Sequence, residues 1–220
     1  MPLFRTGKQT QKVRSTDRLP PGQKLVRGWP VLHEGPIPDF LPESWKFRIF
    51  GAVESEVVLN WPQFQALPQA SVTADFHCVT TWSRYDNRWQ GVGVDTILGL
   101  VRVDPRVTHV MLHSFDALGY DTNLPFDDFK RQENLFATHH DGSPLTPEHG
   151  GPMRYVCHHL YAWKSAKWCS GVEFMIGDRR GFWERNGYHK RADPWFEERY
   201  SYQEEEWATS SHLRSFGRST

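Results

Sequence analysis

Cys78 is the residue of this 220-residue chain whose type and setting most directly suggest chemistry. It lies in the stretch ADFHCVTTWS, residues 74–83, where an apparent strand runs into a turn. Its side chain could be a small buried packing residue, a nucleophile, or a soft ligand to a metal that is held mainly by something else. A nucleophile needs a base, and the adjacent His77 is poorly placed, because successive side chains of a strand point to opposite faces.

Metal ligation by Cys78 would need further ligands from elsewhere. Zinc takes several protein ligands, and the other two cysteines, Cys157 and Cys169, have no zinc-type spacing. The histidine pairs His139–His140 and His158–His159 form no ready chelate, since neighbours on an extended chain face apart, so we expect surface or hydrogen-bonding roles for them. A single thiolate is sufficient only if a cofactor supplies the other ligands. The residues alone leave all three roles for Cys78 open.

A second stretch, HGGPMRYVCHHLYAWKSAKWCSG at residues 149–171, contains no carboxylate. Its cations are Arg154, Lys164 and Lys167. Gly150 and Gly151 would let the backbone approach a ligand closely, and the N–H groups of such turns can bind an anion. The arginine is suited to bidentate recognition of phosphate, and the lysines would act as point charges. The stretch therefore predicts either a site for a phosphate-bearing ligand or a solvated basic face.

The charge balance and the absence of several known motifs exclude some classes of partner and of enzyme. Lys plus Arg and Asp plus Glu number 26 each, so the chain has no strong overall field for nucleic acid or an anionic membrane. No apolar run approaches the length of a membrane span, and no Walker, GxGxxG, GxSxG or HExxH motif occurs. The N-terminus lacks a secretory signal and the cysteines are odd in number, which predicts reduced thiols and a cytoplasmic location.

The elements that must position these residues are predicted from apolar periodicity. Strands are expected at 45–53 (with Trp45, Phe47 and Ile49 on one face), 71–79, 106–115, 134–140, 153–159 and 171–176. Short helices are expected after an Asn60 cap with Pro62 in the first turn, at Asp95, and over 123–131. The 17 Gly and 15 Pro predict many turns, and the ten Trp predict a core of large rings. Strands outnumber helices, so the expected class is mixed α+β.

Several ordered motifs resemble the sulfite-oxidase-type molybdopterin-binding domain. They are FHCVTTWSRYDNRWQGV, HSFDALGYDTNLPFDDF, and HGGPMRYV followed by LYAWKSAKW. The stretches DRLPPGQKLVRGWPVLHEG and GFWERNGYHKRADPWFEERY are similar to the two ends of the small bacterial, cytoplasmic members of that family. The resemblance implies a mostly β, mixed-sheet fold, with residues 1–20 as a flexible arm, 21–200 as the molybdopterin-binding domain and 201–220 as a polar tail.

The resemblance also implies a molybdenum–molybdopterin cofactor. Cys78 would be the single protein ligand to molybdenum, and the pterin dithiolene and oxo or hydroxo groups would complete the coordination. The further cofactor contacts carried over by position are Trp29, Leu32, His33, Ser114, His149, Arg154, Ser165, Ala166 and Lys167. Within this set the backbone near Ser165 and Ala166 would approach the cofactor phosphate, and Lys167 would balance its charge.

The activity implied is two-electron oxygen-atom transfer on a small substrate, sulfite-like or sulfoxide-like, with an electron-transfer partner that remains unidentified. Animal and plant sulfite oxidases follow the ligand cysteine with an arginine pair, whereas this chain has only Arg84 there, which favours the sulfoxide-reductase branch. Trp82, Arg84 and Tyr85 are expected in the pocket wall.

Two other functions remain compatible with the sequence. One is a non-catalytic module of the same fold that binds a pterin or a phosphate. The other is a thiol-dependent enzyme that pairs Cys78 with a distant histidine such as His113.

Overall fold

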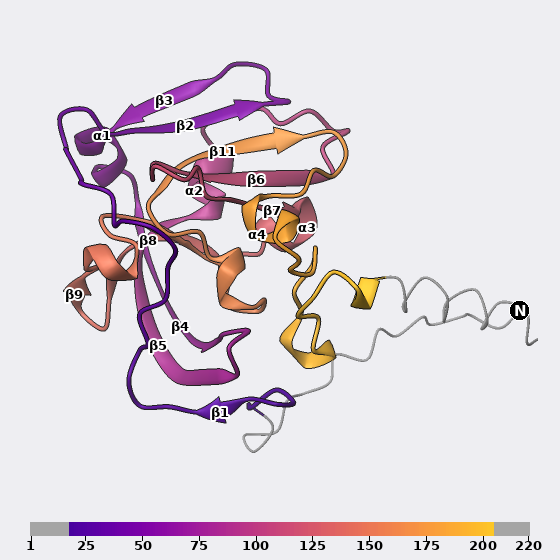
Figure 1. The fold of residues 1–220 in the computed structure, drawn as a ribbon. Helices are drawn as coiled ribbons and strands as arrows, with labels where there is room; N and C mark the ends of the chain where they lie inside the picture. Colours follow the sequence, from indigo (N-terminus) through magenta and orange to yellow (C-terminus); the bar gives the residue numbers. More distant parts are fainter. Residues whose placement is uncertain (1–17, 205–220) are drawn as a thin grey trace, which may run out of the picture.

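Two mixed β-sheets form the framework of residues 18–204, the part of the chain that this computed structural model describes (Figure 1). The six-stranded sheet has the order β1 (Lys24–Leu25), β5 (Trp82–Gly93), β8 (Leu135–His140), β10 (Arg154–Val156), with β4 (Gln69–His77) on β5 and β9 (Ser143–Pro144) on β8. The five-stranded sheet has the order β3 (Val57–Asn60), β2 (Lys46–Gly51), β11 (Cys169–Met175), β6 (His109–Ser114), β7 (Asp121–Pro125). Two pairings, β1 with β5 and β2 with β11, are parallel.

The helices of the described residues are short. They are α1 (Trp61–Gln65), α2 (Val94–Leu98), α3 (Phe126–Phe129) and α4 (Phe182–Arg185), with 3₁₀ turns η1 (Pro147–His149), η2 (Ala162–Lys164) and η3 (Pro194–Phe196). The predicted mixed α+β, mostly β class is confirmed. Within residues 18–204 no helix has the length and apolar character needed to cross a bilayer.

The main core lies between the two sheets and is built largely from aromatic rings, as the composition predicted. Phe47 of β2 and Phe136 of β8 meet edge to face across the sheets, with ring centroids 5.0 Å apart. Trp45, Phe47 and Ile49 are all buried, which confirms the predicted strand face. Asn60 caps α1 as expected, since its side chain accepts the Gln63 N–H and the Gln63 side chain accepts the Asn60 N–H.

Two predicted elements need correction, and one strand was missed. The helix expected at Asp95 begins one residue earlier, at Val94, with Gly93 as its N-cap. The helix expected over 123–131 is limited to Phe126–Phe129, because the preceding residues pair with β6 as strand β7. The longest strand, β5, was not predicted, because its buried positions include the polar residues Ser83 and Asn87, which break the apolar alternation.

A smaller hydrophobic cluster lies beneath the six-stranded sheet and contains Cys78. Its members include Phe76, Trp82, Trp89 and Leu145. The segment after α4 lies beside this cluster, drawn in yellow at the right of Figure 1. A backbone hydrogen bond holds this segment, because the Tyr161 N–H donates to the carbonyl of Ala192 at 2.8 Å. Arg199 donates to the carbonyl of Val79 at 2.7 Å, next to Cys78.

The predicted arm and tail fall mostly on residues 1–17 and 205–220, which lie outside the described residues, so both remain predictions. Arg18 is described. Its Nε donates to Asp75 Oδ2 at 2.8 Å, and its Nη2 donates to Asp86 Oδ1 at 2.6 Å.

Candidate active site

One cavity of about 310 Å³ is lined by every residue that the sequence proposed as a metal or cofactor contact. These residues are Trp29, Leu32, His33, Cys78, Ser114, His149, Arg154, Ser165, Ala166 and Lys167. They come from the N-terminal loop, the end of β4, the end of β6 and the segments on either side of β10. Sequence positions more than 130 residues apart therefore share one site, as in the 2.8 Å bond that Lys167 donates to the carbonyl of Leu32 across a separation of 135 residues.

Cys78 is held by a tight turn at the end of β4. Its N–H donates to the carbonyl of Trp82 at 2.9 Å, and its carbonyl accepts the Thr81 N–H at 3.1 Å. Thr81 takes the left-handed conformation that closes the turn, with φ 72°. Gln23 adds a side-chain bond of 3.1 Å to the same carbonyl. The backbone of Cys78 is thus fixed before any ligand binds.

The sulfur of Cys78 is buried but reaches the cavity. The residue is 8% exposed, and the Thr80 hydroxyl donates to Sγ at 3.2 Å. Burial raises the pKa of the thiol, while the Thr80 hydrogen bond and the charges of Arg154 and Lys167 oppose that rise. The sulfur therefore faces groups that stabilise a thiolate, in a setting where a free thiolate is disfavoured.

Neither proposed histidine base reaches this sulfur. His77 Nδ1 is bonded to the Ser83 hydroxyl at 2.8 Å. His113 Nε2 is bonded to Glu173 at 3.0 Å and does not line the cavity. Within residues 18–204 the side-chain donor bonded to Cys78 is Thr80. The same residues contain no group of three or more His, Cys, Asp or Glu side chains that could hold a metal ion by themselves.

Arg154 is the first of two cations that line the cavity. It is 3% exposed, and its two terminal nitrogens donate to the carbonyls of His149 and Ser165, each at 2.9 Å. Its Nε is buried and has no hydrogen-bond partner among the described residues. The guanidinium packs against Trp29 and Phe76, 5.5 and 5.3 Å from the ring centroids. Burial lowers the pKa of Arg154 to about 9.

Lys167 is the second cation of the cavity. Its Nζ donates to the carbonyls of Leu32 and Glu148 at 2.8 and 2.7 Å. Burial, followed by the charge of Arg154, lowers the pKa of Lys167 to about 7. Two desolvated cations that repel each other would be stabilised by an anion placed between them. This charge pattern fits a phosphate group.

The remaining predicted contacts shape the cavity. The ring of Trp29 stacks on His149 with centroids 3.7 Å apart and an interplanar angle of 11°. The Ser114 hydroxyl donates to the carbonyl of Lys167 at 2.6 Å, which ties β6 to the cationic segment. Ser165 is likewise committed to the protein, since its hydroxyl accepts the Cys157 N–H at 2.9 Å.

The structure corrects two expectations about the cationic stretch. Lys164 does not face the cavity, because its Nζ forms a fully buried ion pair with Glu184 at 2.7 Å. Gly150 and Gly151 allow close packing of the chain on itself rather than on a ligand. A Cβ at Gly150 would lie 2.9 Å from Lys167, and one at Gly151 would lie 2.2 Å from the carbonyl oxygen of Leu145.

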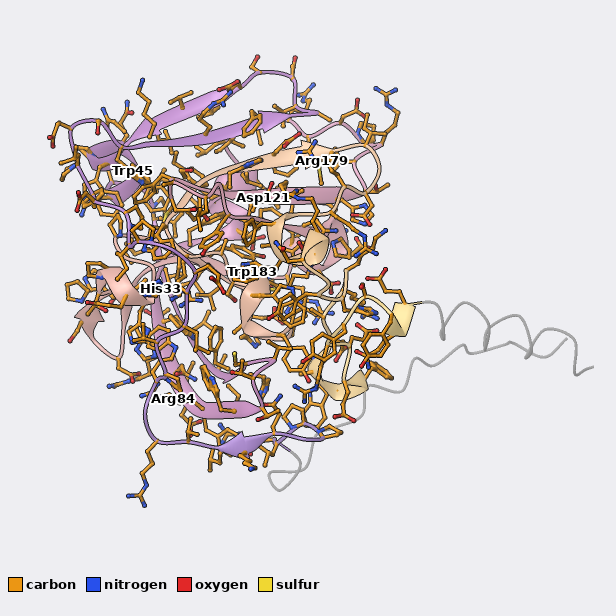
Figure 2. All side chains as sticks on the ribbon, viewed as in Figure 1. His33, Trp45, Arg84, Asp121, Arg179 and Trp183 are labelled. Carbon is orange, nitrogen blue, oxygen red and sulfur yellow. The ribbon has the colours of Figure 1, made fainter. Side chains whose placement is uncertain are left out.

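Of the three residues expected in the pocket wall, only Trp82 lines the cavity. Arg84 points away and donates to Asp141 at 2.6 Å, and Figure 2 shows it well separated from Trp183. Tyr85 lies under the guanidinium of Arg18, 4.3 Å from its ring centroid. Both expectations were wrong because β5 continues as a strand after Trp82 and carries these side chains out of the cavity.

The sequence reasoning missed a group of rings that we call the aromatic wall. It consists of Tyr120, Trp163, Trp183 and Tyr188. These residues come from the start of β7, from η2 and from α4 and the turn after it. The motifs LGYDTN and ERNGY contain two of them, but neither has a spacing that predicts a shared site.

Comparison with known proteins places these observations in a family. The family model described as oxidoreductase molybdopterin binding domain matches residues 34–183. The uncharacterized oxidoreductase YuiH of Bacillus subtilis is 43% identical over 195 residues, covering 88% of this chain and 98% of the relative. The protein-methionine-sulfoxide reductase catalytic subunit MsrP of Campylobacter jejuni is 24% identical over 176 residues, covering 71% of this chain and 59% of the relative.

A solved structure shares the fold. The sulfane dehydrogenase SoxCD of Paracoccus pantotrophus superimposes with a TM-score of 0.61 at 17% identity, over 72% of this chain and 46% of that one. This likeness confirms the predicted fold class. The chain spans little more than half the length of the reductase and less than half of the dehydrogenase chain.

Proposed function

The chain belongs to the family of oxidoreductase molybdopterin-binding domains, and from this premise we propose that it catalyses two-electron oxygen-atom transfer on a small substrate of the sulfoxide type. One observation carries the proposal. A single cavity joins one fixed thiol to two desolvated cations, Arg154 and Lys167, at separate places on its wall.

The residues present fit the cofactor that the family binds. Cys78 would hold molybdenum, and the unpartnered Nε of Arg154 together with Lys167 would face the phosphate. The stacked rings of Trp29 and His149 would lie along the pterin. When bound, the cofactor supplies the two-electron redox couple and the exchangeable oxygen, chemistry that protein side chains do not provide.

The chain itself orients and shields this chemistry. The turn that fixes the Cys78 backbone sets the direction of the sulfur, so little ordering is required when the metal binds. The Thr80 hydroxyl stabilises negative charge on the sulfur through its 3.2 Å hydrogen bond. Trp82, on the same wall, and the enclosed position of the thiol limit access of water.

The cavity supports a sulfoxide-type substrate better than sulfite. An anionic substrate would need a cation in addition to those that face the phosphate, and the arginine that follows the ligand cysteine, Arg84, is paired with Asp141 outside the cavity. The acidic residues of the lining are Glu34, which is exposed, and Asp121, which is paired with Arg185, so they add no attraction for an anion.

The proposal includes an external electron carrier, a small-molecule substrate, no nucleic-acid or membrane partner, and a cytoplasmic location. The balanced charge supports the absence of a polyanionic partner. The three free cysteines support a reducing compartment.

Elemental analysis of protein produced in a molybdenum-competent host tests the proposal. We expect about one molybdenum atom per chain and reduction of dimethyl sulfoxide with an artificial electron donor, at a higher rate than oxidation of sulfite. Bound pterin without turnover of any oxide would instead indicate a non-catalytic binding module. Activity of metal-free protein that is abolished by thiol alkylation would indicate the thiol-dependent enzyme.

A further inference from the structure

The cavity lining combines two chemically different sets of side chains. Arg154, Lys167 and His149 form one set, and the aromatic wall and Asp121 form the other. Arg154 and Lys167 are the only arginine and lysine of the lining within the described residues. The phosphate of the cofactor accounts for the two cations, whereas none of the aromatic residues is among the expected cofactor contacts.

The rings of the aromatic wall form a corner. Trp183 and Tyr188 stand at an interplanar angle of 90°, with centroids 5.7 Å apart. Tyr120 adjoins Trp183 at 5.3 Å, and Trp163 adjoins Tyr188 at 5.1 Å. Trp163, Trp183 and Tyr188 are only half-buried, so they are not fully used in core packing. Rings at a right angle can surround a compact group, which a flat stack cannot do.

Negative charge lies beside this corner. Asp121 directly follows Tyr120 and lines the same cavity. Its Oδ1 accepts the Phe182 N–H at 2.5 Å and lies 3.3 Å from Arg185. Arg185 is 53% exposed in its side chain and does not line the cavity, so this partly solvated ion pair is weak and neutralises Asp121 only in part. Glu34 is the other acidic residue of the lining, and its backbone carbonyl accepts the Tyr120 hydroxyl.

We propose that the aromatic wall and Asp121 select oxide substrates that carry an alkylammonium group. This inference rests on the proposed function and specifies its substrate class. An alkylammonium group is attracted by the faces of several aromatic rings and by a neighbouring carboxylate, and its methyl groups fill an apolar corner. An anion would be repelled by the same residues. A neutral group of equal shape would gain only the hydrophobic part of the interaction.

Choline and 3,3-dimethyl-1-butanol test the proposal, because they have the same shape and differ in charge. Neither is an oxide, so binding to the cofactor-loaded protein is measured by calorimetry without turnover. We expect choline to bind about tenfold more tightly than the alcohol. Equal affinities for the two compounds would overturn the inference.

Substitutions in the wall locate the effect. Asp121→Asn and Trp183→Leu should each reduce the preference for choline by about threefold or more, and Tyr188→Leu provides a second ring variant if Trp183→Leu does not fold. Trp195→Leu is the matched control, because Trp195 is 41% exposed in η3 and does not line the cavity. An unchanged preference in folded Asp121→Asn and ring variants would contradict the assignment.

The binding measurement separates the two proposals. Selective choline binding by protein that reduces no oxide would overturn the proposed function while supporting the cation site. Reduction of dimethyl sulfoxide by protein that binds both compounds equally would support the function and overturn the cation site.

Discussion

Cys78 and Cys169 are both buried thiols at the ends of strands, yet their surroundings differ in kind. Cys169 begins β11 in the main core, is fully buried, and has a pKa raised to about 12 by burial. Its N–H donates to the carbonyl of Met153 at 2.9 Å. Cys78 lies in the smaller cluster, at a cavity with two cations and beside the Thr80 hydroxyl. Burial makes a thiol inert, whereas a cavity with donors and cations makes it a ligand.

The largest predicted effect is a loss of bound metal on substitution of one of these two thiols. Cys78→Ser should lower bound molybdenum by more than about tenfold, because in the proposed site the metal would lose its only protein ligand. Unfolding in denaturant should change little, since the site is at the edge of a cavity. Molybdenum is measured by elemental analysis of the purified protein.

Cys169→Ser is the matched control and should show the opposite pattern. Burying a hydroxyl in the main core, where the Cys169 thiol has only a weak 3.8 Å contact with the carbonyl of Gly171, should lower the free energy of unfolding by about 1–3 kcal/mol, with molybdenum retained in the folded fraction. If both serine variants lost metal equally, the distinction between the two regions would fail.

The second prediction concerns acid stability, because half-buried histidines pack against rings of the small cluster, as His140 and His149 do on Trp29. Burial lowers the pKa of His140, His149 and His158 to about 4 each. An unfolded histidine titrates near 6.5, so the unfolded state binds more protons between pH 6.5 and 4. Stability is therefore fully present above this window and should fall as pH decreases through it.

Thermal unfolding of cofactor-free protein between pH 7 and 4 measures this effect, and the midpoint should fall by several degrees. His140→Gln should flatten the decline, because His140 packs 4.3 Å from Trp29 and 4.5 Å from Trp89, centroid to centroid. Equal slopes for the wild type and His140→Gln would contradict the prediction.

The smallest predicted effect concerns the hydroxyl beside Cys78. Thr80→Val removes the donor to Sγ and keeps the side-chain shape, so the thiolate loses one hydrogen bond. Alkylation of Cys78 in cofactor-free protein at pH 8 should slow by about two- to tenfold. Thr81→Ser is a suitable control because it leaves the Thr80 hydrogen bond in place. If Thr81→Ser and Thr80→Val were alkylated at the same rate, the Thr80 hydroxyl would have no effect on the thiolate.

The sequence predicted correctly the features for which a local pattern has a single structural explanation. Asn60 with Gln63 three positions later predicts a capping box, and the structure contains it. The alternation of Trp45, Phe47 and Ile49 predicts a buried strand face for the same reason, because a strand has a period of two. Cys78 stood out because ordered motifs surround it, and their family resemblance identified ten of the residues that line the cavity.

The sequence misled where a polar residue finds its partner far along the chain. Ser83 and Asn87 can be buried in β5 because Ser83 donates to Gln23 and bonds to His77, and Asn87 donates to the carbonyl of Ala74. Nothing in the local pattern of residues 82–93 reveals such partners, so the longest strand was overlooked. Arg84 was assigned to the cavity for the same reason, although its partner Asp141 lies outside it.

By itself the sequence determined the class of fold, the strand faces built on apolar alternation, and the thiol around which a molybdopterin site could form, because these depend on local periodicity and on recognisable motifs. Only the tertiary structure decided which cations face the cavity and which are neutralised. Lys167 faces it, whereas Lys164, three residues earlier, is paired with Glu184. The aromatic wall was also decided there, because its rings come from three separate segments that meet only when the two sheets pack together.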